Sequence, residues 1–479
     1  MMSRDEIRAV YEQGEAAVVE LVEGLLQRIQ VLETRLDEVE GRLIKDSQNS
    51  NQPPSGDGFA KRTRSLRGKS QKKSGGQPDH PGQTLEWRDQ VDEIIEHRVE
   101  QCAGCGASLR ATLAEQVFAR QVHDIPAIAL KVSEHRVEVK CCAGCGQVNQ
   151  GQFPESVSTV VQYGPRLKGM MVYLMEGQLL PSERTVEILS DLLGVSVSEG
   201  TLYNVREQAY QHLAGITTEI SNTLLISEVV HFDETGLRVN GQLWWLHVAS
   251  TNALTYYFIH PKRGKIAMDE MGILPHYDGK AIHDGWKSYL IYACEHFLCN
   301  AHHLRELQFI VERYQQLWAF SMSLLLVSIY TQVEAAKAAG QTALPPEQLS
   351  AVETRYQAIL AEGFQVNPPL PAPETAKPRG RPKQSPPQNL LERLRSQRPS
   401  VLGFMYDFTV PFDNNQAERD SRMMKLKQKI SGSFRSPGGA RMFCRIRGYL
   451  STLRKQGHNV LDALVALFSG EPKPLFQPE

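Results

Sequence analysis

The sequence predicts an α+β protein of several domains, and three observations support that prediction. The chain has 479 residues, 41% of them hydrophobic, which is enough for about two to four domains. Five strand-like segments follow one another between residues 228 and 299. Helical patterns come before and after them, and strands in one run with helices in another are typical of α+β folds.

Residues 1–45 predict a coiled coil. Apolar side chains recur at alternating spacings of four and three, with charges between them, at Val18, Val22, Leu25, Ile29, Leu32, Leu36, Val39 and Leu43. Helices with this pattern pair along their apolar seam, so we expect a homo-oligomer. The alternative is an amphipathic helix packed on its own body, because Gly24 and Gly41 weaken the helix.

Residues 46–85 predict a linker, since they are rich in Ser, Gly, Pro and polar residues and almost lack aliphatic side chains. The linker carries a cluster of basic residues that would neutralise phosphates if it ordered on DNA. A solvated tail is the alternative. The cluster includes Lys61, Arg62, Arg64, Arg67 and Lys69.

Residues 86–155 contain two CxxCG motifs, Cys102 with Cys105 and Cys142 with Cys145, separated by strand-like runs. Four thiolates can hold Zn2+ tetrahedrally, and the glycine permits a tight turn beneath the metal. We therefore predict a structural zinc domain, in which Cys141 is an alternative to Cys142. Such a site has no open position for chemistry.

Residues 156–222 predict a helical domain that resembles a helix-turn-helix. Helical patterns over 185–193 and 199–209 flank the turn Gly194-Val195-Ser196, and Ser198 is a suitable cap. DNA binding and a hairpin used only for packing are both open, because Arg206 is the only lysine or arginine of the second helix.

Residues 223–310 predict the first part of the core, with strands over 228–233, 243–249, 255–259, 280–283 and 296–299. A helical insertion with a Pro-rich basic linker follows over 311–400, then a second core part over 401–450 and a helical tail over 451–479. The uncharged window 314–333 holds many polar side chains. It predicts a buried or partner-facing helix, not a membrane span.

The charges of the chain are segregated, although their formal sum is only -1. Residues 61–73 hold seven basic and no acidic side chains, and residues 376–455 hold 18 basic against 5 acidic. This layout is typical of a nucleic-acid binder with an acidic body. Within the second stretch, Arg379 and Arg381 form an Arg-Gly-Arg that suits a narrow minor groove, or simply a tether.

Three carboxylates are candidates for a metal-dependent phosphoryl-transfer site. Asp233 and Asp284 end the first and fourth predicted strands, and Glu418 lies near the start of a helix. Such oxygens suit a pair of Mg2+ or Mn2+ ions about 3.5–4 Å apart. Other interpretations stay open: Glu234 competes with Asp233, Asp284 can cap a turn, and Asn415-x-x-Glu418 resembles a capping box.

Several motifs resemble the transposases of insertion sequence family 66: His231-Phe-Asp-Glu-Thr235, Cys299-Asn-Ala-His302, Pro411-Phe-Asp-Asn-Asn-Gln-Ala-Glu-Arg419 and Lys429-Ile-Ser-Gly-Ser-Phe-Arg435. The order of segments is also similar to that family, over nearly the whole chain. The resemblance implies an RNase H-like catalytic core with an Asp-Asp-Glu triad. It assigns the triad to Asp233, Glu418 and, as second Asp, Asp284, with Asp278 as the weaker alternative.

The resemblance implies further roles near the triad. The Cys-x-x-His motif at Cys299 and His302 is an accessory element that we expect to serve packing or substrate positioning, because no second pair of soft ligands lies nearby; a metal site is the alternative. Arg305 is a phosphate candidate. Basic residues that follow Glu418 flank a site for a polyanion. As DNA contacts there we select Arg419, Arg422, Lys425 and Lys429.

Together these features predict a DNA transposase that binds the terminal inverted repeats of an insertion sequence and catalyses metal-dependent end cleavage and strand transfer. Its cofactors would be Mg2+ or Mn2+ and structural Zn2+, and its partners DNA, a second copy and accessory proteins of the same element. The charged N-terminus lacks the apolar segment of a signal peptide, so we expect a place in the bacterial cytosol or nucleoid. The alternatives are a zinc-containing DNA-binding regulator without catalysis and an RNase H-like nuclease or resolvase without strand transfer.

Overall fold

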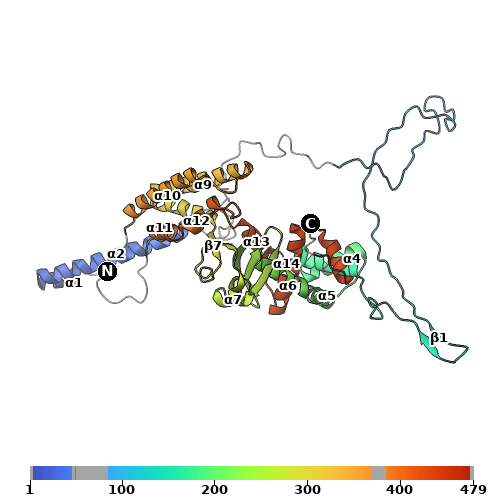
Figure 1. Cartoon of the computed structure of the whole chain (residues 1–479), viewed down its shortest axis with the longest axis horizontal. Helices are drawn as coiled ribbons and strands as arrows, with labels where there is room; N and C mark the ends of the chain where they lie inside the picture. The colour runs from blue at the N-terminus through green and yellow to red at the C-terminus, as the bar shows by residue number, and fades with distance from the viewer. Residues whose placement is uncertain (1–3, 46–48, 50–84, 369–383, 475–479) are drawn as a thin grey trace.

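The structure is a computed structural model that describes residues 4–45, 49, 85–368 and 384–474. At its centre lies a mixed sheet of β3 (Val229–Val239), β4 (Gln242–Ser250), β5 (Thr255–His260), β6 (Lys280–His283) and β7 (Glu295–Leu298) (Figure 1). The strand order is β5-β4-β3-β6-β7. The pairs of β3, β4 and β5 are antiparallel, whereas β6 and β7 add in parallel. The predicted five strands and the α+β class are confirmed.

The hairpin between β3 and β4 extends both strands beyond the predicted ranges. Its turn consists of only Asn240 (φ 47°) and Gly241 (φ 74°), both in the left-handed region. This is the backbone of a two-residue hairpin turn, for which Asn-Gly is the preferred sequence. The strands therefore pair without interruption from His231 with Ser250 to Val239 with Gln242.

One helical layer covers the β3–β4–β5 end of the sheet. It consists of α3 (Pro165–Val172), a π-helix (Tyr173–Gly177), α4 (Ser182–Leu193), α5 (Glu199–His212), α6 (Ala214–Leu225), α14 (Pro437–Lys455) and α15 (Val460–Phe468). Buried residues of these helices form one core with residues of β3 and β4. In this layer α14 packs on β5 and α15 packs on α3.

The predicted helix-turn-helix segments are helices α4 and α5. Gly194 in the left-handed conformation (φ 64°) ends α4, and the Ser198 hydroxyl accepts a hydrogen bond from the Thr201 N–H at 3.1 Å to begin α5. The single arginine of α5, Arg206, forms an ion pair with the buried Glu176 of the π-helix. That cation therefore serves packing within the protein.

A second helical group packs beside β6 and β7. It consists of α8 (Asn300–Tyr314), α9 (Leu317–Ala338), α10 (Pro346–Val366), α11 (Pro386–Ser396) and α12 (Arg398–Tyr406), whose apolar side chains form a separate core (Figure 1). Helix α12 contacts β7 and α9. The connection from β5 to β6 contains α7 (Lys265–Met271) and a 3-10 turn (Leu274–His276).

Helix α9 contains most of the uncharged window noted in the sequence. In length and hydropathy it meets the criteria for a membrane-crossing helix. One side is buried against the helical core, through Trp318, Met322, Leu326, Ile329 and Val333. The other side exposes Leu317, Phe320, Leu324 and Val327. Helix α9 is therefore buried along one side and exposed to solvent along the other.

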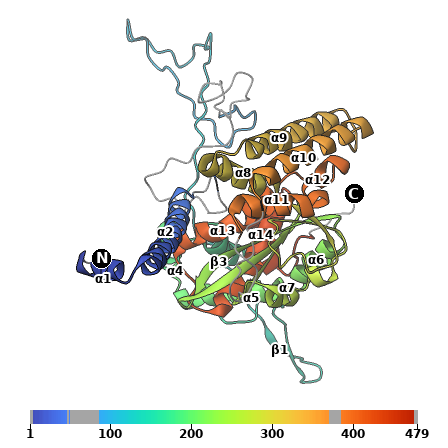
Figure 2. The same ribbon diagram turned by 90° about the vertical axis from the view of Figure 1, so that its left-hand side faces the viewer.

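The N-terminal segment forms α1 (Arg4–Glu12) and the 30-residue helix α2 (Glu15–Ile44) (Figure 2). The C-terminal end of α2 meets α8: Arg313 pairs with Glu40 at 3.1 Å, and the Lys45 ammonium lies 5.2 Å from the Phe309 ring centroid. Six members of the heptad stripe are exposed, namely Val22, Leu25, Ile29, Leu32, Leu36 and Val39.

Candidate functional site

The parallel pairing of β3 with β6 brings Asp233 and Asp284 to neighbouring positions on adjacent strands. His231 of β3 is in register with Ile282 of β6, so the two aspartates, each two residues further on, lie at matching positions. Asp284 directly follows β6 as predicted, but the prediction that Asp233 ends its strand is wrong: β3 continues to Val239 because it pairs with β4 along the whole hairpin. Asp278 precedes β6, is exposed, and lies at its opposite end. Of the two candidates for the second aspartate, Asp284 is thus the neighbour of Asp233.

A chain of hydrogen bonds holds the backbone that follows Asp284. The Gly285 N–H donates to His283 Nδ1 at 3.0 Å, and the Trp286 N–H donates to Asp284 Oδ1 at 2.8 Å. His283 Nε2 in turn meets His296 Nδ1 at 3.0 Å. Gly285 has φ +85°, which a residue with a side chain adopts only with strain. Oδ1 of Asp284 is therefore fixed by the turn, and within the described structure no hydrogen bond engages Oδ2.

Glu418 comes from α13 (Asn415–Ser431), which packs on β3 and β4. It lies in the first turn of that helix. Ser421, one turn later, donates to the Glu418 carbonyl at 3.0 Å, and its hydroxyl also acts to lower the pKa of Asp233. The helix begins at the cap residue Asn414, without a side-chain capping bond. The capping-box interpretation of Glu418 is therefore wrong: its carboxylate faces Arg305 at 3.5 Å and Arg422 at 3.6 Å instead.

The side chain and backbone of Asn414 join the three segments of the site. Its Nδ2 donates to the Phe232 carbonyl at 2.7 Å, and its Oδ1 faces His231 Nδ1 at 2.9 Å. Its N–H donates to Cys299 Sγ at 3.1 Å, and its carbonyl accepts the Glu418 N–H at 3.2 Å. Asn414 thus fastens β3 to the starts of α8 and α13.

The carboxylates act on one another electrostatically. Burial, together with the charges of Glu234, Glu418 and Asp284, raises the pKa of Asp233 to about 8. Burial also raises the pKa of Glu418, although Arg305 and Arg422 oppose the shift. Crowded carboxylates of this kind are stabilised by a bound cation, because a cation relieves their mutual repulsion.

Glu234, the competitor of Asp233, is engaged elsewhere. Its buried carboxylate accepts hydrogen bonds from Arg263 Nη2 at 2.6 Å, Arg263 Nε at 3.0 Å and the Tyr289 hydroxyl. The Arg263 guanidinium is stacked between two tryptophan rings, 4.8 Å from Trp245 and 4.2 Å from Trp286. This pairing engages the Glu234 carboxylate, so Asp233 is the better candidate of the two for a metal ligand.

The Cys-x-x-His motif lies against Glu418. Cys299 caps α8, and His302 lies in its first turn. The Cys299 Sγ, a ring nitrogen of His302 and a carboxylate oxygen of Glu418 all lie within 4.8 Å of one another. His302 Nδ1 is 3.8 Å from Glu418 Oε1 and has no hydrogen-bond partner within the described structure. These atoms form a possible metal site that includes a predicted triad member.

The structure divides the predicted DNA contacts into three groups. Arg419, Arg422 and Lys429 are exposed on α13. Lys425 is half-buried and donates to the Gly236 carbonyl at 2.6 Å, so its charge is used within the protein. The remaining contacts lie outside the described residues: Lys61, Arg62, Arg64, Arg67, Lys69, Arg379 and Arg381.

The two CxxCG motifs adopt the same turn. The Gly106 N–H donates to the Cys102 carbonyl at 2.9 Å, and the Gly146 N–H donates to the Cys142 carbonyl at 2.8 Å. The two glycines have φ of 72° and 73°, the left-handed backbone that this turn requires. The second turn lies in a small hairpin of β1 (Val139–Cys141) and β2 (Val148–Gln150). The glycines therefore play the part that the sequence predicts.

Within each turn the two cysteines interact. Hydrogen bonds from the Cys105 N–H, the Gly104 N–H and the Cys105 thiol lower the pKa of Cys102. In the second turn, hydrogen bonds from the Gly144 N–H, the Cys145 N–H and the Cys145 thiol lower the pKa of Cys142 in the same way. Each pair thus favours a thiolate, which is the form that binds a metal.

The predicted cluster of four thiolates is not assembled in this structure. Among the described residues, Cys102 and Cys105 do not come together with Cys142 and Cys145 as one group of ligands. Each turn is closed by its own local hydrogen bonds, and no backbone hydrogen bond joins one turn to the other in the part of the chain described. A zinc ion would itself be the link that draws the two turns together. Cys105, Cys142 and Cys145 are accordingly exposed, and Cys102 is half-buried.

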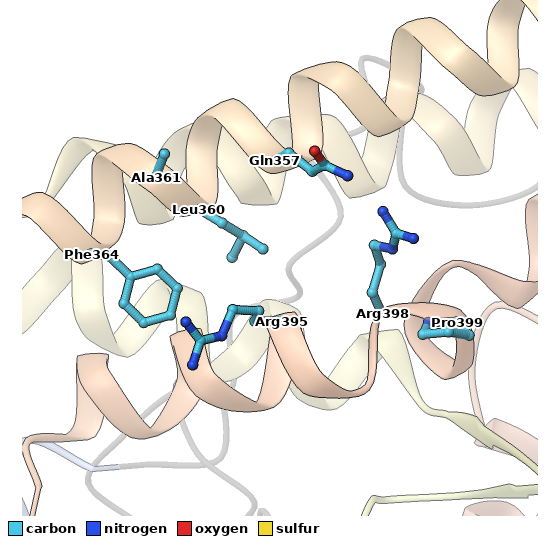
Figure 3. A pocket seen from close by; sticks show the side chains of 7 residues that line it. All are labelled: Gln357, Leu360, Ala361, Phe364, Arg395, Arg398 and Pro399. Atoms are coloured by element: carbon cyan, nitrogen blue, oxygen red, sulfur yellow. The ribbon is translucent and has the colours of Figure 1, made fainter.

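The helical insertion contains a cavity of about 500 Å³ between α10 and the α11–α12 segment (Figure 3). Two arginines, Arg395 and Arg398, extend toward it, and Phe364 and Leu360 supply apolar surface. The Arg395 guanidinium stacks on Phe364 at 4.7 Å and pairs with Glu392 at 2.6 Å. None of the site residues predicted from the sequence lines this cavity.

Sequence reasoning missed three parts of the site, namely Asn414, the Arg263 stack and the His283–His296 pair. Asn414 lies in the same motif as Glu418, residues 411–419, and this proximity was the one signal in the sequence that could have indicated a role for Asn414. The other two depend on contacts between segments that no local pattern reveals.

Comparison with known protein families places this geometry in context. A family model described as "Transposase IS66 family" matches residues 160–442, which include Asp233, Asp284, Cys299, His302 and Glu418. A family of unknown function, DUF6444, matches residues 3–86. No curated protein matches the chain. Because the first match covers more than half of the 479 residues, the chain belongs to the IS66 transposase family.

Proposed function

We propose that the chain is an Asp-Asp-Glu transposase with an RNase H-like core, whose triad is Asp233, Asp284 and Glu418. The observation that carries this proposal is the parallel register of β3 and β6, by which both aspartates lie at matching positions on adjacent strands, next to the helix that bears Glu418. The sheet, with three antiparallel strands followed by two parallel ones, supports the fold assignment.

The chemistry of the donors favours Mg2+ or Mn2+ as the ions that the triad would hold. Hard divalent ions prefer carboxylate oxygens, and the raised pKa of Asp233 indicates an excess of negative charge. When bound there, the ions would activate the attacking water or 3′-hydroxyl and stabilise the leaving oxygen. In this proposal the turn at Gly285 orients Asp284, and Asn414 keeps Glu418 close to Asp233.

The other segments would handle DNA and assembly. Exposed cations of α13 would hold the phosphate backbone, and Arg305 would contact the phosphate nearest to Glu418. The two cysteine turns would close around Zn2+ and, with the basic linker, bind the terminal inverted repeats. Helix α2 would pair two protomers through its exposed apolar stripe, with the complex acting in the bacterial cytosol, with or without accessory proteins.

A reaction with DNA tests the proposal. The full chain is incubated with Mg2+ or Mn2+ and a donor that carries the terminal repeats of its element, and cleaved ends and joined products are measured. Asp233→Asn and Glu418→Gln should each lower end cleavage by at least ~100-fold, whereas Asp278→Asn, at the opposite end of β6, should retain it.

The results of this reaction distinguish the proposed function from its two alternatives. End cleavage by Asp233→Asn and Glu418→Gln at the wild-type rate would overturn the triad. Cleavage without joining would favour a nuclease or resolvase that lacks strand transfer. Specific binding of the repeats without any cleavage by the wild type would favour a DNA-binding regulator.

A further inference from the structure

We infer that Cys299, His302 and Glu418 form a binding site for a thiophilic divalent ion of the zinc class, which competes with the hard catalytic ions for Glu418. The proposal that the ion binds rests only on the arrangement of these three side chains. The regulatory consequence rests on the proposed function, since it requires Glu418 to act in catalysis.

The three side chains supply the ligand set that such an ion prefers. Thiolate, imidazole and carboxylate are common zinc ligands, at about 2.0–2.3 Å from the metal. The three ligand atoms lie within 4.8 Å of one another, so movements of about 1 Å would seat one ion among them. A site with three protein ligands keeps a fourth position for water.

The surroundings act on two of these ligands. Cys299 is buried at the N-terminal end of a 15-residue helix, and its sulfur accepts the Asn414 N–H at 3.1 Å. Burial and the charge of Glu418 raise the pKa of the Cys299 thiol to about 12, and the Asn414 N–H only partly opposes this shift, so the thiol would lose its proton as the metal binds. His302 is 8% exposed, and its Nδ1, which faces Glu418, lacks a hydrogen-bond partner within the described structure. An unpartnered buried ring nitrogen is costly unless a ligand satisfies it.

Competition at Glu418 follows from its position. The same carboxylate would serve the catalytic ions on its Asp233 side and the thiophilic ion on its Cys299 side. Arg305 now occupies Oε1 at 3.5 Å and must give way when the ion enters. Removal of this guanidinium should therefore strengthen binding of the thiophilic ion, although it removes a proposed phosphate contact.

Cobalt spectroscopy tests the binding step on the full chain. Co2+ replaces zinc in such sites, and a thiolate ligand gives it a charge-transfer band. The wild-type spectrum should contain a component that Cys299→Ser lacks and that His302→Asn binds at least ~10-fold more weakly. Cys444→Ser, at another buried cysteine that is not part of this group of ligands, is the matched control and should retain the component. Arg305→Gln should bind Co2+ more tightly.

The outcomes separate the site from the proposed function. Circular dichroism verifies that each variant folds. Identical cobalt spectra for folded wild type, Cys299→Ser and His302→Asn would overturn the site, whatever the protein does to DNA. The second arm compares Mg2+-dependent end cleavage with and without added Zn2+: the ratio of rates should fall at least ~10-fold for wild type and much less for Cys299→Ser. An equal ratio in both proteins would overturn the competition.

Discussion

Asn414 lies at the meeting point of three segments that the proposed triad needs. Its side chain satisfies the Phe232 carbonyl and faces the ring of His231, both of which are buried. Asn414→Ala should therefore lower the free energy of unfolding by about 1–3 kcal/mol, because buried polar partners are left unsatisfied. Urea unfolding followed by circular dichroism measures the change.

The adjacent Asn415 provides the control for Asn414. It is exposed, and its side chain bonds only Asp413, its near neighbour, among the described contacts. Asn415→Ala should change the free energy of unfolding by at most about 0.5 kcal/mol. Equal losses in the two alanine variants would mean that Asn414 does not join the segments as described.

Lys427 shows that a basic residue beside the site need not face DNA. It is buried, with its ammonium 4.0 Å from the Phe434 ring centroid and a hydrogen bond of 2.9 Å to the Gly432 carbonyl. Burial lowers the pKa of Lys427 from 10.5 to about 8. Between these values the unfolded chain holds a proton that the folded chain has lost, so stability from this group rises with pH.

Lys427→Met should remove this contribution. In unfolding experiments at pH 7 to 10.5, wild type should gain stability relative to Lys427→Met as the pH rises above about 8. Lys429→Met, at an exposed position of the same helix, is the control variant. A difference between wild type and Lys427→Met that stays constant over this range contradicts the assignment.

At the scale of elements, local patterns predicted the strands and the antiparallel pairing of the first three, but not which strand β6 pairs with. Alternation of side chains and the Asn240-Gly241 turn located four strands to within one residue at each end, because both signals are local, whereas β3 runs six residues past its predicted end. The parallel pairing of β6 with β3 depends on the intervening α7 connection and on packing, which periodicity does not encode. The candidate site shows the same division. Its carboxylates were identified from sequence motifs. The roles of Asn414 and of the Arg263 stack could be identified only from contacts between segments in the folded structure.

Helix α2 carries an apolar stripe that is exposed in a single chain. Leu25→Asp, Ile29→Asp and Leu32→Asp in one variant should convert an oligomer to monomers, since charges cannot be buried in an apolar seam without a large cost. Sedimentation analysis measures the mass. Gln27→Asp, which lies opposite the stripe by heptad position, should leave the oligomer intact. A monomeric wild type would contradict pairing through α2.

The cysteine turns are formed but separate, and the segment around them exposes many large apolar side chains, such as Ile94, Leu113, Phe118 and Val122. Zinc binding that draws Cys102 and Cys105 toward Cys142 and Cys145 would bury such groups and couple metal to folding. We expect a chelator to accelerate proteolysis within residues 85–160.

Serine variants identify the zinc ligands among these cysteines. Cys102→Ser and Cys142→Ser should behave like the chelated protein, because each removes one proposed ligand. Cys141→Ser should resemble wild type. The reverse result for Cys141 and Cys142 would exchange their roles, and no response to chelation would contradict the zinc domain.

At the scale of the whole molecule, the formal charge of -1 conceals a basic stretch over residues 376–455, and the fold decides which of its charges meet solvent. Arg447 is buried and donates to the carbonyls of Glu176 and Gly177 at 3.0 Å. Arg445 stacks on the Tyr210 ring at 3.8 Å. Fewer charges of this stretch are therefore free to meet DNA than the sequence count indicates, and on α13 the proposed DNA surface consists of Arg419, Arg422 and Lys429.

The salt dependence of DNA binding measures this surface. Each phosphate contact contributes a slope of about 0.9 to the fall of log affinity with log salt concentration, because bound counterions are released. Replacing Arg419, Arg422 and Lys429 together by glutamine should therefore reduce the slope by up to about 3. Lys425→Gln should reduce the slope little, because the ammonium of Lys425 is bound to the Gly236 carbonyl. Replacement of the exposed cations Lys337 and Arg355 on the helical insertion is the control for overall charge. If that control flattens the slope as much as the α13 variant does, the contacts lie on the insertion, and the assignment of the DNA track to α13 fails.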